Sequence, residues 1–391
     1  MKLAGDSDFQ QLTIDLDYTG KASSTPTATP VGLIALDVNL AVGGQNDNLL
    51  IERRASGTTY LTVSGRGQAT TPNRYTLIHV NAASNMTGDE FVLLGSGIIG
   101  PYTFKLIYDF NSDSGEADII FAPANSADVA RRLDEDFLRR AGMRELVAAG
   151  VALQPYVPLY EAYPSVLLDM MAMPSFETRS GGRYDHGEAL SSGPALDAVW
   201  GRVEGAFSHN DPEDATAGYD TDLSRMELQA GLDGLFLDND AGTLIASLTG
   251  HYKDGEAKVG SPFGGSKIRP EGWGFGGTVT WLGASGFYVD GQADLTWFTS
   301  ELKADSLPLA PEDGDAFGYG LSAEIGQRIT LSEGFSLTPQ AQLAFSNVSI
   351  DGFTGAYGES INFDDGQSLV GRLGLGLEKL SQWQDAAGKT R

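Results

Sequence analysis

The side chains that could do chemistry are few and scattered in this chain of 391 residues. Its four histidines form no HExxH or other closely spaced metal-binding pattern, so the sequence predicts no metal site and no cofactor. They are His79, His186, His209 and His251. The Gly-x-Ser-x-Gly turn that presents a nucleophilic serine does not occur, and the absence of cysteine excludes thiol catalysis. We therefore expect a protein that is not an enzyme.

One acidic segment has a superficial likeness to a calcium-binding loop. Residues 109–116 read Asp-Phe-Asn-Ser-Asp-Ser-Gly-Glu. In a calcium loop the glycine stands at the sixth position and a glutamate at the twelfth, whereas here the glycine is seventh and that glutamate is missing. A hairpin turn between Tyr108 and Ile119 is the better interpretation.

Charged residues at alternate positions are more informative. In residues 199–207, Arg202 and Glu204 share one face of an extended strand, while Val203 and Phe207 share the other. Opposite charges within one strand are what a hydrated interior tolerates, so we expect these side chains to face a wet lumen. The predicted lumen-facing residues are Arg202, Glu204, Arg225, Glu227, Asp290, Asp294, Glu324, Arg328, Arg372 and Glu378.

The elements that must position these residues are about eight strands of membrane-spanning length. The apolar face of several strands begins or ends in an aromatic residue, such as Trp273, Trp281 or Trp297, as bilayer interfaces select. Alternation alone fits a soluble sandwich equally well, but the charges and the aromatic residues favour an antiparallel transmembrane barrel. The segments are 199–207, 226–236, 244–252, 273–281, 287–297, 317–328, 337–345 and 369–378.

The composition narrows the possible partners. The formal net charge of −26 would repel the phosphates of DNA or RNA, so we expect no nucleic-acid partner. No run of about 18 apolar residues occurs, which excludes an ordinary transmembrane helix. Any integral contact with a membrane must therefore be made by strands.

Two regions precede the predicted barrel. Short apolar runs separated by turn residues predict a β-rich unit over residues 1–124, which is either a sandwich or a solenoid. Over residues 125–185 the period becomes helical. One helix begins near Ser126, and a second runs from about Tyr160 to Met173, where Pro174 ends it.

The segments Val157–Pro164, Pro174–Arg179 and Val199–Gly205 resemble the linker and the first barrel strand of autotransporters, the type V secretion proteins. Residues 32–37, 47–51 and 100–106 are similar to the pertactin-like stem that ends the secreted passenger. The resemblance implies a helix inside a twelve-stranded outer-membrane barrel, with the passenger at the cell surface. The residues expected on that pore helix are Tyr160, Glu161, Ser165 and Asp169.

The ends of the chain depart from the family pattern. No apolar signal segment follows Met1, and the last residues, 385–391, include no strand and no terminal aromatic residue. We therefore expect a fragment that holds about eight of the family's twelve strands, with the C-terminally incomplete barrel domain over residues 186–391. The linker has no Asn-Asn pair, so we expect no cleavage of the type that some members carry out between two asparagines.

The resemblance implies a translocator and display module that exports and anchors an N-terminal passenger. Its expected partners are outer-membrane lipid, the barrel-assembly machinery and, through passenger residues upstream, a host surface. Two alternatives stay open: an adhesin whose binding region lies upstream, and a soluble acidic all-β binding protein. Dependence on detergent separates the soluble protein from the translocator.

Overall fold

The computed structural model describes most of the chain. The described residues are 9–21, 32–40, 44–66, 74–94, 97–100, 102–124, 153–181, 184, 196–213, 215–305, 312–331, 335–355 and 360–379. Within these ranges the chain is almost entirely β-strand, with two helices. Neither helix is long and apolar enough to cross a bilayer.

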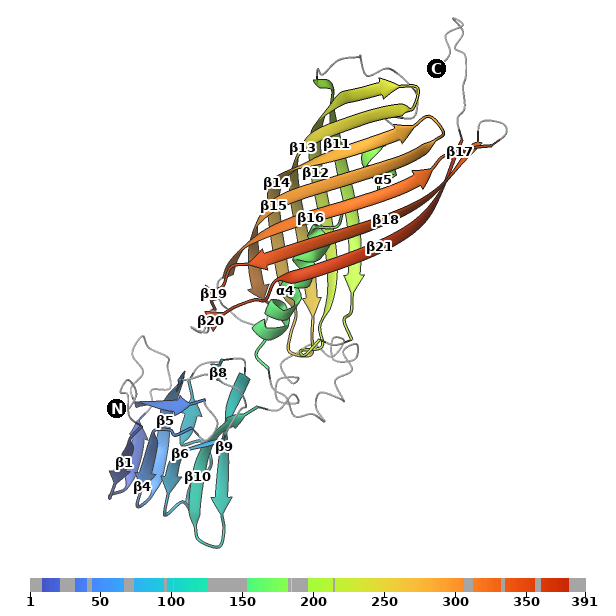
Figure 1. Cartoon of the computed structure of the whole chain (residues 1–391). Coiled ribbons are helices and arrows are strands. Elements are labelled where there is room, and N and C mark those ends of the chain that lie inside the picture. The colour runs from blue at the N-terminus through green and yellow to red at the C-terminus, as the bar shows by residue number, and fades with distance from the viewer. Residues whose placement is uncertain are drawn as a thin grey trace, which may run out of the picture.

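The C-terminal half forms one curled antiparallel sheet (Figure 1). Each long strand pairs with the next along the chain, and within the described residues β11 and β21 are its edges. The prediction of about eight long strands is confirmed. They are β11 (Leu196–Asn210), β12 (Asp220–Asn239), β13 (Gly242–Gly260), β14 (Ser266–Gly283), β15 (Phe287–Ala304), β16 (Glu312–Gln327), β18 (Phe335–Ile350) and β21 (Gly366–Lys379). Three short strands lie in its connections: β17 (Ile329–Thr330), β19 (Phe353–Thr354) and β20 (Ser360–Ile361).

The burial of this sheet is inverted relative to a soluble protein. On the convex face, Val203 is 71% exposed and Phe207 is 87% exposed. On the concave face, Glu227 is 5% exposed and Asp290 is 1% exposed. A soluble domain would hide the apolar face and expose the charges, whereas a bilayer solvates the apolar face directly.

Aromatic side chains form a row across the convex face. Tyr252, Trp273, Trp297 and Phe317 stand directly opposite one another on β13 to β16. The rings of Trp273 and Trp297 lie 5.3 Å apart, and so do those of Trp297 and Phe317. Such a girdle marks one edge of the lipid-facing band.

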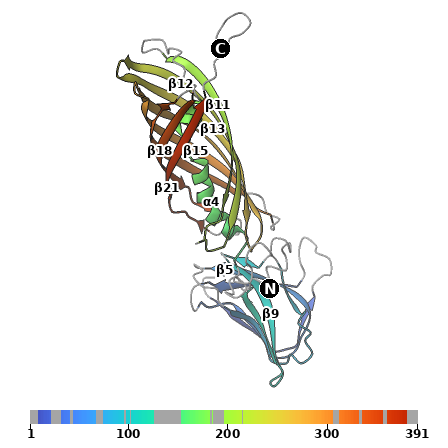
Figure 2. The same ribbon diagram turned by 90° about the vertical axis from the view of Figure 1, so that its right-hand side faces the viewer.

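The linker occupies the curve of the sheet. Helix α4 (Tyr156–Met170) lies within the curve in both Figure 1 and Figure 2, and it contacts strands from β12 to β21. A short helix, α5 (Phe176–Ser180), follows, with Ser175 accepting a hydrogen bond from the Thr178 amide at its start. The predicted second helix is therefore present, although it ends at Met170 and not at Met173. The short helix α5, which follows it, was not predicted. The helix predicted near Ser126 falls outside the described residues.

The N-terminal unit is built from parallel strands that stack in successive coils. On one side β1, β4 and β6 pair in parallel, and on the other β5 pairs in parallel with β2, β3 and β7. This pairing is that of a solenoid and not of an antiparallel sandwich. The antiparallel hairpin of β9 and β10 packs against β6 and ends the stack. The bounds are β1 (Gln11–Ile14), β2 (Tyr18–Lys21), β3 (Leu33–Asn39), β4 (Asn48–Ile51), β5 (Ala55–Arg66), β6 (Tyr75–Val80), β7 (Phe91–Leu93), β8 (Ile98–Ile99), β9 (Tyr102–Asn111) and β10 (Glu116–Pro123).

The predicted calcium-like loop is the turn of that hairpin. Asn111 ends β9, Glu116 begins β10, and Gly115 takes a positive φ of 75° in the turn between them. The amides of Asp113 and Ser114 both donate to the side chain of Asn111, as in a tight turn. The hairpin interpretation is confirmed.

Candidate functional site on the concave face

Helix α4 is held first by apolar contacts. Its side chains Leu159, Tyr163 and Leu167 are fully buried, in a cluster that includes Leu223 and Phe298 from the strands. The sequence interpretation assumed a polar lumen. The structure differs, because the wall of the lumen around α4 is apolar. Because each fully buried side chain of this size contributes roughly 1.5–3 kcal/mol, this contact accounts for much of the helix's attachment.

Each of the four residues predicted on the pore helix makes a polar contact. Tyr160 donates to the Glu312 carboxylate on β16 across 2.7 Å. Glu161 accepts from the backbone amides of Thr216 and Ala217 in the connection after β11. Asp169 accepts from the Ser208 hydroxyl on β11 across 3.0 Å, and Ser165 donates to the Ala162 carbonyl of its own helix. Three of these four residues thus tie α4 to different parts of the sheet.

The residues that follow α4 are bound through their main chain. The ammonium group of Lys253 on β13 donates to the Met170 carbonyl across 2.9 Å, and Arg372 on β21 donates to the Met173 carbonyl across 2.6 Å. Gln292 on β15 and Gln342 on β18 both donate to the Pro174 carbonyl, at 3.0 and 2.9 Å. We call this group of donors, with Ser346, which donates to Met171, the carbonyl clamp.

Glycines on the strands make room for the methionines of the same segment. A Cβ atom at Gly318 would lie 2.8 Å from the sulfur of Met171, and one at Gly320 would lie 2.8 Å from the sulfur of Met173. Both distances are shorter than ordinary contacts between carbon and sulfur. The linker therefore passes close to the backbone of β16, where larger side chains would obstruct it.

Helix α5 is fixed by buried charges. The Arg179 guanidinium pairs with Asp290 on β15, and both side chains are at most 1% exposed. Thr278 and Thr280 accept further hydrogen bonds from the same guanidinium. The Glu324 carboxylate on β16 accepts from the backbone amide of Phe176, the first residue of the helix, across 2.9 Å. A carboxylate at a helix N-terminus also meets the favourable end of the helix dipole.

The remaining predicted lumen residues form two groups. Arg202 lies 2.6 Å from Glu204 and 3.5 Å from Glu227, and Arg225 lies 3.9 Å from Glu204. Arg328 and Glu378 pair across 2.6 Å at the other end of the sheet. Asp294 is buried on the concave face beside Gly276, where an added Cβ would collide with its carboxylate.

Several clamp residues were absent from the predicted set. Lys253 continues the alternation of Ser247, Thr249 and His251 along β13, so the period-2 pattern carried the signal that would have found it. Gln292 and Gln342 also stand on the polar face but are uncharged. Arg179 lies in the linker, and nothing in its own spacing indicates a partner on β15.

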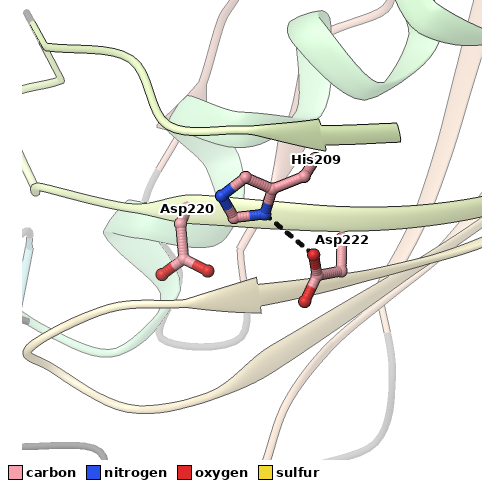
Figure 3. A group of neighbouring side chains, drawn as sticks. All are labelled: His209, Asp220 and Asp222. Carbon is pink, nitrogen blue, oxygen red and sulfur yellow. Dashed lines mark hydrogen bonds and ion pairs between the residues drawn. The ribbon is translucent and has the colours of Figure 1, made fainter. Parts of the chain in front are cut away.

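A separate group lies on the convex side at the end of β11 and β12. The ligand atoms of His209, Asp220 and Asp222 lie within 4.8 Å of one another, and His209 Nδ1 is 2.8 Å from Asp222 (Figure 3). His209 on β11 stands directly opposite Asp222 on β12, and Asp220 lies two residues before Asp222 on the same strand. The sequence analysis missed the group because only the strand pairing brings the histidine to the two aspartates. Exposed groups of this kind are common without a bound ion.

A family model decides what this arrangement belongs to. The model described as the autotransporter β-domain matches residues 199–391, from the first barrel strand onward. Residues 199–391 are an autotransporter β-domain. This domain resides in the bacterial outer membrane with its passenger exposed at the surface.

Relatives of the autotransporter chain match almost all of it. The adhesin BmaC autotransporter of Brucella suis biovar 1 is 32% identical over 407 aligned residues, which cover 97% of this chain and 11% of the relative. The pertactin autotransporter of Bordetella bronchiseptica is 26% identical over 403, covering 97% of this chain and 42% of the relative. The chain thus spans less than half the length of each of these relatives.

Solved structures of autotransporters show more distant likenesses. The β-domain of the Bordetella autotransporter BrkA has a TM-score of 0.39 at 22% identity, over 49% of this chain and 72% of that one. The transport unit of AIDA-I from Escherichia coli has a TM-score of 0.45 at 18% identity, over 61% and 75%.

The connections orient the autotransporter sheet in the membrane. The two longest, between β11 and β12 and between β18 and β21, join strand ends on the side where α4 begins and the solenoid is attached. The shortest turns, residues 240–241 and 284–286, lie at the other end. Outer-membrane barrels keep short turns on the periplasmic side and longer loops outside. The solenoid therefore lies on the extracellular side.

Proposed function

We propose that the concave face retains the linker after export, so that the β-domain anchors the solenoid at the cell surface. The observation that carries this proposal is the carbonyl clamp. Four strands supply donors to the main-chain carbonyls at the end of α4 and in the segment before α5, those of Met170, Met171, Met173 and Pro174. The charged donors Lys253 and Arg372 contribute about 1.5–3 kcal/mol each and the neutral donors about 0.5–1.5 kcal/mol each, so together they oppose withdrawal of the linker.

In this proposal the chain has three parts with different tasks. The solenoid, residues 1–124, is the end of the passenger; residues 125–185 are the linker; and residues 186–391 are the membrane domain. The predicted lumen-facing charges line the path that the linker takes. Autotransporter translocator domains are typically non-enzymatic, and we extend this to the present chain, which turns over no substrate.

Contact between the solenoid and the sheet supports a rigid display. Tyr102 of β9 pairs with Leu153 just before α4, and the Thr103 hydroxyl donates to the Leu153 carbonyl. Leu153 packs in turn with Ala217 and Phe263 from the extracellular connections. The solenoid is thus held against the rim and not only tethered by the linker.

Disulfide trapping tests the position of the linker, because the chain has no cysteine of its own. In the Asp169→Cys/Ser208→Cys variant, we expect a disulfide in outer-membrane fractions, seen as a mobility shift without reducing agent. The matched control is Asp169→Cys/Val203→Cys, whose second cysteine lies on the same strand but on the convex face. Equal cross-linking of both pairs, or none in the first, would refute the proposal.

A second proposal concerns the longer protein. Because the relative BmaC is an adhesin, we propose that passenger residues upstream of a chain like this one bind a host surface. The assembly machinery for outer-membrane barrels is the proposed partner during insertion. The adhesin proposal is tested by comparing the adhesion of cells that display the whole passenger with that of cells that display residues 1–391 alone. Equal adhesion would contradict the adhesin proposal.

A further inference from the structure

The convex face carries a row of lysines beyond the extracellular aromatic girdle. Lys258 on β13 stands directly opposite Lys267 on β14, and Lys267 stands directly opposite Lys303 on β15. The structure gives none of the three an ion pair among the residues that it describes. Like charges directly opposite each other destabilise a sheet, so this row has a cost in the folded protein.

The row is unusual for this chain. The formal net charge is −26, yet three cations adjoin on neighbouring strands. Among the residues that the structure describes, Asp222 opposite Lys258 is the one acidic residue in register with the row, and its carboxylate already lies 2.8 Å from Nδ1 of His209. Lys267 has a lysine on each side.

The height of the row above the membrane is set by the strands. Each lysine stands six residues beyond an aromatic residue of the girdle, as Lys267 does from Trp273. Six residues at about 3.3 Å each, on a strand tilted by about 40°, give roughly 15 Å. The lysines therefore lie above the girdle by more than the depth of a simple phospholipid headgroup.

The intervening positions discriminate between anionic lipids. Asp254 and Glu271 stand opposite each other immediately beyond the girdle, and Arg269 above them is shared by Glu256 and Glu301. A phosphate close to the acyl chains would meet these carboxylates. An anionic group further along a saccharide headgroup would reach the lysines instead.

We propose that Lys258, Lys267 and Lys303 bind the anionic groups of a phosphorylated oligosaccharide headgroup on an outer-leaflet glycolipid. The bound lipid neutralises the lysine row and fixes the extracellular rim of the sheet in its leaflet. Each lysine near an anionic surface is expected to change the affinity about fivefold.

Titration of the full chain in maltoside micelles tests the proposal, with EDTA present to remove bridging cations. The probes are lipopolysaccharide with a phosphorylated core, lipopolysaccharide without core phosphates, phosphatidylglycerol and inorganic phosphate. We expect the first to bind best. The triple Lys258→Gln/Lys267→Gln/Lys303→Gln variant should lose at least about tenfold in affinity for it, and triple Lys→Arg should retain it. Lys379→Gln, at the opposite rim, is the matched control for Lys267→Gln and should change affinity less than twofold.

The melting temperature of the Lys267→Gln variant should change in opposite directions without and with the lipid. Without lipid, Lys267→Gln should raise the melting temperature of the sheet, because it removes two like-charge pairs. With the core-phosphorylated lipid bound, the same substitution should lower the melting temperature. Unchanged affinity in the triple variant, equal binding of phosphatidylglycerol, or full competition by inorganic phosphate would each overturn the proposal.

Discussion

The ammonium group of Lys253 lies 2.9 Å from the carbonyl oxygen of Met170, the last residue of α4. The lysine is 1% exposed and comes from the middle of β13, so a charge from the wall of the sheet closes the C-terminus of the helix. The helix dipole places partial negative charge at that end. This contact links the membrane domain to the position where the linker leaves its helix.

Replacing Lys253 by Met should weaken the attachment of α4. The substitution keeps the volume but removes a charged donor, at a cost of about 1.5–3 kcal/mol. We expect a lower temperature for the loss of the compact form on semi-native gels. Lys379→Met, on the convex face, where the ammonium group lies 5.0 Å from the centroid of the Phe335 ring, is the control and should lower that temperature much less. An equal fall in both variants would contradict the role of Lys253.

Arg179→Met should be more damaging. The substitution leaves the Asp290 carboxylate buried without its cation, and breaking a buried pair from one side costs about 3–5 kcal/mol. Adding Asp290→Asn should recover part of the lost stability. The free energy of unfolding, measured in urea, tests this for the single and the double variant. No recovery in the double variant would mean that Arg179 acts through other contacts.

The lipid-facing surface should reject charge. Leu248 is 69% exposed on the convex face of β13, and arginine near the bilayer midplane costs about 2–4 kcal/mol. Leu248→Arg should therefore reduce the amount of folded protein in outer-membrane fractions. Leu16→Arg is the matched control, because Leu16 is 68% exposed on the solenoid, in water. Equal loss in both would argue against a lipid-facing sheet.

The solenoid should show a pH dependence of its own. His79 on β6 lies 2.7 Å from Asp118 on β10. Burial lowers the pKa of His79, but the hydrogen bond and charge of Asp118, with smaller contributions from Asn81 and Glu116, together raise the pKa above its ordinary value of 6.5. Because the folded state binds this proton more tightly, the stabilisation is full below that value and is lost as the pH rises through the folded pKa.

Protease resistance of the solenoid in urea measures this effect in the full chain. We expect the wild type to resist cleavage better at roughly pH 5.5 than at roughly pH 8.5. His79→Gln should show a smaller difference between the two conditions, since it has no proton to gain. The same difference in both proteins would show that other groups cause it.

The long strands were predictable because period-2 alternation is a local property of the sequence. It placed Arg202 and Glu204 on one face and Val203 and Phe207 on the other, and the structure has the same division. The sequence did not distinguish a solenoid from a sandwich, because both need short apolar strands. Only the parallel pairing of β1 with β4, at a separation of 37 residues, does so.

The clamp shows a different limit of prediction. Its acceptors are main-chain carbonyls, which every residue possesses, so the sequence of residues 170–174 carries no mark of being bound. The partners Lys253 and Arg372 become neighbours only when the sheet curls around the linker. The pairing of Arg179 with Asp290 likewise depends on where α5 comes to rest.

Spin-label accessibility along β13 tests the central claim most directly, namely that the convex face meets lipid while the concave face holds the linker. Single cysteines at residues 246 to 251 would be labelled in bilayer-reconstituted protein, which has no native cysteine to interfere. We predict high collision rates with oxygen at residues 246, 248 and 250, and low rates with both oxygen and a water-soluble nickel complex at 247, 249 and 251. Uniform accessibility, or nickel access greatest at the convex positions, would contradict the account.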